Sequence, residues 1–169
     1  FVTGFHPVQV PQSTGLVTYD NSKGDNDLMC SNEVSGNQTT TILNNGTKLQ
    51  FKHLMTRLTF TMQCAPGQTY PERIAGILIG GVRTYASLNL ATGAAYYTIP
   101  GTVYVGHPDG YYVPASDKDK LVLDAIIPPG APISVDVITV NDNVTPVTFS
   151  VLNSLTTSGG AVGKQYVVN

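Results

Sequence analysis

Histidine and serine are the residues of this sequence best suited to chemistry near neutral pH. The three histidines, His6, His53 and His107, lie far apart, and none has a second metal-ligating residue at a paired spacing. A zinc site would have to form from long-range contacts alone. The Gly-x-Ser-x-Gly motif of many serine hydrolases is absent. We therefore expect no catalytic residues, no metal and no cofactor, and interpret the histidines as hydrogen-bonded structural residues.

The tyrosines are concentrated at positions 96, 97, 104, 111 and 112. Exposed aromatic rings can stack on sugar rings, so Tyr104 and Tyr111 are a candidate ligand surface. Neighbouring residues of a strand point to opposite faces, however, and the chain has no Trp. Packing in the core and between strands is the favoured interpretation.

Cys30 and Cys64 are the two cysteines of the chain. In an oxidising compartment, a disulfide between them would add about 3–4 kcal/mol on the chain-entropy model. The alternative is two unpaired, partly buried thiols. Two cysteines alone do not define a disulfide framework, so both interpretations stay open.

The composition excludes several classes of protein. The chain has 169 residues, of which 41% are hydrophobic, enough for the core of one domain or of one domain and part of a second. Only 12% of residues are charged and the net charge is −2, so nucleic acid is not an expected partner. No apolar run reaches the roughly 18 residues that span a bilayer. The first residue, Phe1, suggests that an upstream piece has been removed.

Residues 48–62 form the longest segment with a continuous hydrophobic rhythm. An alternation of period two is typical of a half-buried strand. It runs through Leu49, Phe51 and His53 and then, one residue out of phase, through Leu58, Phe60 and Met62. We predict two strand pieces joined by a kink within residues 54–57.

Short strands at roughly ten-residue spacing, separated by Gly, Pro and Asn turns, are predicted along the rest of the chain and favour an antiparallel sandwich or barrel. The apolar run 74–79 is expected to end at Gly80-Gly81, and further strands are predicted at 121–127, 133–137 and 147–151. Tyr166, Val167 and Val168 form the last strand, an edge that a neighbouring chain could complete.

Several motifs, in the same order along the chain, resemble the fimbrillin family of Bacteroides-type pilus subunits and adhesins. The central one follows Asp27-Leu28-Met29 and contains Leu49, Phe51, His53, Arg57, Leu58 and Phe60. Residues 85–93 and 121–128 resemble two further family segments, and residues 163–166 resemble its closing Gly-Lys-x-Tyr strand.

The resemblance implies an all-β, transthyretin-like Greek-key β-sandwich, mainly antiparallel. It places residues 1–31 as terminal strands of a largely absent first lobe, or as an extension packed on the sandwich, residues 32–44 as a linker, and residues 45–169 as the fimbrillin-like domain. It also implies export to the cell surface, with contact to the outer membrane only through an anchor that this chain lacks.

We expect a non-enzymatic structural subunit that joins other pilus subunits by β-strand addition. Phe51, Leu58 and Phe60 are the expected core anchors, and His53 is expected to fix the kink by hydrogen bonding. The alternative function is a tip or surface adhesin that binds a host glycan or protein. Both functions use the same fold, so the fold does not decide between them.

Overall fold

The computed structural model of the chain describes residues 2–35, 48–67, 73–115, 120–130, 132–140, 144–146 and 160–168. Every regular element in these ranges is a β-strand, so the predicted all-β fold is confirmed. No helix among them is long and apolar enough to cross a membrane. The strands are β1 (Phe5–His6), β2 (Leu16–Asp20), β3 (Met29–Ser31), β4 (Phe51–His53), β5 (Thr56–Met62), β6 (Ile74–Asn89), β7 (Ala95–Tyr111), β8 (Leu121–Ile127), β9 (Ser134–Thr139), β10 (Val144–Pro146) and β11 (Gln165–Val168).

Two predictions from the sequence concern residues that lie partly or wholly outside the described ranges. The predicted linker 32–44 lies outside the described residues from position 36 onward, and the strand predicted at 147–151 lies outside them entirely. The division of the chain at residues 31 and 45 stays a prediction.

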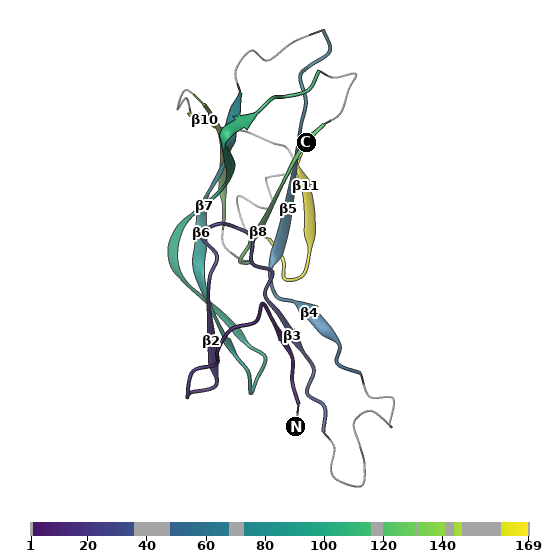
Figure 1. The fold of residues 1–169 in the computed structure, drawn as a ribbon, viewed down its shortest axis with the longest axis vertical. Helices are drawn as coiled ribbons and strands as arrows, with labels where there is room; N and C mark the ends of the chain where they lie inside the picture. Colours follow the sequence, from purple (N-terminus) through teal and green to yellow (C-terminus); the bar gives the residue numbers. More distant parts are fainter. Residues whose placement is uncertain are drawn as a thin grey trace.

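β6 and β7 form one long antiparallel hairpin that runs along the molecule (Figure 1). β6 has 16 residues and β7 has 17, so the prediction that the apolar run ends at Gly80-Gly81 is wrong. Gly81 adopts a φ of 77°, and the β6–β7 register shifts between Ile79 and Val82. Such a β-bulge bends a strand without ending it.

A different sheet packs on the hairpin at each end (Figure 1). At one end, β9 and β10 extend the sheet of β6, and a three-stranded sheet in the order β11-β5-β8 packs on it. At the other end, β2 pairs with β6, and a three-stranded sheet in the order β1-β3-β4 contributes to the core. The fold is therefore a sandwich with two core clusters.

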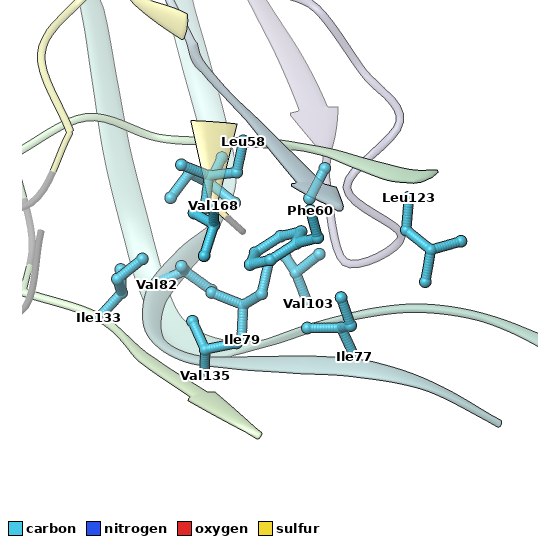
Figure 2. Packing of buried hydrophobic residues seen from close by; sticks show 12 residues of the cluster. Leu58, Phe60, Ile77, Ile79, Val82, Val103, Leu123, Ile133, Val135 and Val168 are labelled. Carbon is cyan, nitrogen blue, oxygen red and sulfur yellow. The ribbon is translucent and has the colours of Figure 1, made fainter. Parts of the chain in front are cut away.

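The first core cluster lies between the sheet of β6 and the sheet of β5 (Figure 2). Leu58 and Phe60 are 0% and 2% exposed, at positions where the sequence analysis expects core anchors. Burying side chains of this size contributes about 1.5–3 kcal/mol each. The other members are Ile77, Ile79, Val82, Val103, Leu123, Ala125, Ile127, Ile133, Val135 and Val168.

Phe51 lies outside both core clusters, so the expectation that it anchors the core is wrong. Its side chain is 47% exposed, and that of Leu49 is 38% exposed. β4 is an edge strand of its sheet, and all three of its residues are exposed. The Phe51 ring covers Gly4, where an added Cβ would lie 2.6 Å from Phe51 Cζ. An alternating pattern predicts a strand but does not say which strand lies at an edge.

The kink falls at Leu54 and Met55, within the predicted range. β4 pairs with β3, whereas β5 pairs with β8 and β11, so the kink carries the chain from one sheet to another. The Leu54 amide donates to Leu28 O at 2.8 Å, and Leu54 O accepts from Tyr97 Oη at 2.6 Å. Burial raises the pKa of Tyr97 to about 12.

Candidate functional site: the C-terminal strand

The structure places Tyr166, Val167 and Val168 in β11, at the edge of the sheet β11-β5-β8. β11 runs parallel to β5, with Gln165 opposite Arg57 and Val168 opposite Phe60. Val168 is 1% exposed and belongs to the first core cluster, whereas Val167 is 48% exposed. The strand therefore presents one apolar face to the core of its own chain and the other to solvent.

Residues 160–164 precede β11 and form hydrogen bonds with Met55 and with the start of β5. The buried Thr56 donates through Oγ1 to Ala161 O at 2.8 Å. The backbone amides of Gly163 and Arg57 donate to Met55 O and Lys164 O, each at 2.9 Å. The position of β11 thus depends on Met55 in the kink and on the first residues of β5.

A polar network joins β11, β5 and β8 on the outer face of their sheet. Asp124 accepts hydrogen bonds from Arg57 Nε at 3.2 Å, from Arg57 Nη2 at 2.7 Å and from Thr59 Oγ1 at 2.6 Å. Gln165 Nε2 donates to Thr59 Oγ1 at 3.1 Å. The bonds from Arg57, and then that from Thr59, hold the pKa of Asp124 below its ordinary value. Sequence reasoning missed Asp124, although it is the only charged residue in the apolar run 121–127.

Replacing Asp124 with Asn should lower the free energy of unfolding by about 0.2–1 kcal/mol at neutral pH, because the Arg57–Asp124 pair is solvent-screened. Because the pKa of Asp124 is lower in the folded than in the unfolded state, the ionised side chain stabilises the fold. This contribution to the free energy of unfolding is fully present above the unfolded-state pKa of about 4, and it is lost as the pH falls through the folded-state pKa. Urea titrations at about pH 7 and about pH 3 measure the free energy of unfolding. The difference in this free energy between the wild type and Asp124→Asn should be smaller at about pH 3.

Asp25→Asn is the matched control, because Asp25 is an exposed carboxylate in a loop. It should leave the free energy of unfolding nearly unchanged at both pH values. An Asp124→Asn loss that is equally large at low and neutral pH would contradict an ionic origin for the effect.

His53 lies in β4 beside the kink, and its Nδ1 is 2.6 Å from Asp27 Oδ2. Asp27 belongs to the segment that leads into β3, whose Met29 pairs with His53. That His53 holds the kink in place stays a prediction. In the part of the chain that the structure describes, no three metal-ligating side chains form a group.

Tyr104 and Tyr111 do not form one surface. Tyr104 is 41% exposed, and its hydroxyl donates to Ala75 O at 2.9 Å. Its neighbours Val103 and Val105 pack in or against the core, so the Tyr104 ring points to the opposite face. Tyr111 packs against that core, with its ring 6.1 Å from the His107 ring. The two rings therefore lie on different faces of β7.

Cys30 and Cys64 are free thiols, so the disulfide left open by the sequence is not formed. Both are buried, but in different surroundings. Cys30 lies in the second core cluster with Val17 and Leu28. Cys64 follows β5, and its Sγ donates to Val113 O at 3.6 Å.

Comparisons with known proteins agree with this architecture. A family model described as fimbrillin-like matches residues 2–169. The chain is similar to a candidate cell adhesion protein from Bacteroides uniformis, with a TM-score of 0.67 and 19% identity over 98% of this chain and 65% of that one. It is also similar to one from Bacteroides ovatus, with a TM-score of 0.54 and 14% identity over 86% of this chain and 54% of that one. The chain thus spans under two thirds of either structure, and no curated protein matches it significantly.

Proposed function

Because the chain belongs to the fimbrillin-like family, we propose that it is a structural, non-catalytic subunit of a cell-surface fimbria, joined to other pilus subunits by β-strand addition. The observation that carries this proposal is the place of β11. It is a four-residue strand that, among the described residues, lies at a sheet edge and pairs with β5 alone, and its one fully buried side chain is that of Val168. Edge strands of this kind are templates for pairing between chains.

Strand addition in which the β11 of one subunit replaces the β11 of its neighbour beside β5 has a defined register. A copy of residues 165–168 from a neighbouring subunit would offer β5 the same alternation, with Val168 directed into the core and Val167 directed to solvent. Backbone hydrogen bonds would supply affinity. The core position of Val168 would fix the register, because a slip by one residue would turn every side chain to the other face.

Disulfide trapping between two variants tests this exchange. Thr59 and Val167 are direct partners across β5 and β11. A Thr59→Cys chain and a Val167→Cys chain are mixed, unfolded, refolded together at high concentration and oxidised. If β11 exchanges between copies, a disulfide links the two variants, since partner Cα atoms in a sheet lie within the span of a disulfide.

Two controls frame this experiment. The double variant Thr59→Cys/Val167→Cys should form the disulfide within one chain, which establishes that the geometry permits it. Val122 is exposed on β8, which lies on the other side of β5 from β11. A Val122→Cys chain should therefore form no disulfide with a Val167→Cys chain. Light scattering should also show oligomers that a peptide copying residues 163–169 dissociates. A disulfide only within the double variant, together with a strictly monomeric mass, would overturn the exchange of β11.

A surface adhesin is the second candidate function, and the two similar structures of candidate cell adhesion proteins favour it. Both functions would place the chain at the cell surface. An adhesin needs a recognition site for a glycan or a host protein, and the separated rings of Tyr104 and Tyr111 do not supply a shared aromatic surface.

A further inference from the structure

A pocket of about 210 Å³ opens beside the kink, where segments far apart in the sequence meet. Its polar lining consists of Asp27 before β3, His53 and Arg57 on either side of the kink, and Lys164 and Gln165 at the start of β11. The volume is below the roughly 300–1,000 Å³ of pockets for drug-sized ligands. It therefore suits a ligand of about one small ring.

The pocket gathers charge on a chain that has little of it. Only 12% of the residues are charged, yet Asp27, Arg57 and Lys164 line this one hollow together with His53. Met55 and Ile126 add an apolar part to the lining. Pockets with apolar walls and a few convergent polar groups are typical of small-molecule sites.

Bonds within the protein occupy only part of each polar group. His53 uses Nδ1 toward Asp27, and its Nε2 has no hydrogen-bond partner among the residues that the structure describes. Arg57 uses Nε and Nη2 toward Asp124, and within the described ranges its Nη1 has no hydrogen-bond partner. The Lys164 ammonium forms no ion pair with any residue that the structure describes. The pocket therefore retains unused donors, two of them on permanently charged groups.

We propose that this pocket binds an acidic sugar residue, a pyranose that carries a carboxylate. Lys164 and Arg57 suit the carboxylate, because charge-assisted hydrogen bonds are the strongest that a site can offer. His53 and Gln165 suit the ring hydroxyls, which both donate and accept. Met55 and Ile126 suit the apolar C–H face of the ring. A single chain carries the complete lining of this site, which does not include Tyr104.

Amide chemical shifts of the ¹⁵N-labelled chain, titrated with defined sugars, test the proposal. The acidic probes are the methyl glycosides of glucuronic acid and N-acetylneuraminic acid, which distinguish a uronic from a sialic acid. Methyl glucoside is the neutral match for the first, and acetate is the bare carboxylate. At least one acidic probe should shift the amides of His53, Lys164 and Gln165, with an apparent Kd about ten-fold below that of methyl glucoside or acetate.

Lys164→Gln should weaken binding of that acidic probe about ten-fold and leave the amide spectrum away from the pocket unchanged. Lys23→Gln removes the same charge from an exposed loop outside the pocket and should bind like the wild type. Should Lys164→Gln perturb the fold, His53→Gln provides a second variant with the same expected direction. Equal binding of acetate or methyl glucoside, no shifts with either acidic probe, or wild-type affinity in both pocket variants would overturn the proposal.

Discussion

Replacing Phe60 with Ala is expected to lower the free energy of unfolding by about 3–5 kcal/mol. Phe60 is 2% exposed and lies among Ile79, Val82 and Val103 in the first core cluster (Figure 2). The variant loses buried apolar surface and leaves a cavity that its close-packed neighbours fill only in part. For a chain of this size, the melting temperature should fall by roughly 6–20 °C, measurable by circular dichroism.

Phe51→Ala is the matched control, because it removes the same atoms from a side chain that is 47% exposed. Its ring covers Gly4, just before β1, at the sheet β1-β3-β4. We therefore expect the free energy of unfolding to fall by about 1 kcal/mol or less. Urea titrations of both variants should separate them clearly. Equal losses would mean that β4 is covered in solution and that Phe51 is a second core anchor.

These two phenylalanines also mark how far the sequence predicts the fold. Each lies on an alternating run, and the change of phase between the runs predicts the kink. The assignment of each run to a sheet depends on the pairing of β4 with β3 and of β5 with β8. A period of two carries no information about such partners, so Phe51 and Phe60 look equivalent until the strands are paired.

The length of β6 also depends on pairing with distant strands, so it could not be predicted from the local sequence. A Gly-Gly pair usually ends a strand, and the turn chemistry at Gly80-Gly81 predicts an end there. In the structure, β7 pairs with β6 on both sides of this pair and β9 pairs with it up to Gly80. Pairing with strands distant in sequence carries β6 through the bulge, and local sequence signals contain no information about these partners.

The candidate sites divide in the same way. Alternation and family resemblance single out Tyr166, Val167 and Val168, because a strand is a local pattern. The partners Asp27 of His53 and Asp124 of Arg57 are 26 and 67 positions away from them. Only the fold brings such pairs together, so the pocket beside the kink could not be predicted from spacing.

The bulge itself leads to the second large effect. Gly81→Ala should lower the free energy of unfolding by about 2–4 kcal/mol, for two independent reasons. Gly81 has a φ of 77°, which L side chains rarely adopt. A Cβ at this position would also overlap Pro132 O, in the backbone just before β9. Either β9 must move away from β6 or the bulge must change shape, and both disturb the strand that supplies Ile77, Ile79 and Val82 to the core.

Gly15 separates these two causes. It also has a positive φ, of 73°, but an added Cβ would have no atom within 4 Å. Gly15→Ala should therefore cost only the backbone term, about 1 kcal/mol. Asn tolerates a positive φ better than Ala does, so Gly15→Asn should be nearly neutral, whereas Gly81→Asn should stay strongly destabilised in urea titrations. If Gly81→Asn were as stable relative to Gly81→Ala as Gly15→Asn is relative to Gly15→Ala, and nearly neutral, the contact with Pro132 O would not contribute to the loss of stability. The bulge would then need glycine for its backbone angle alone.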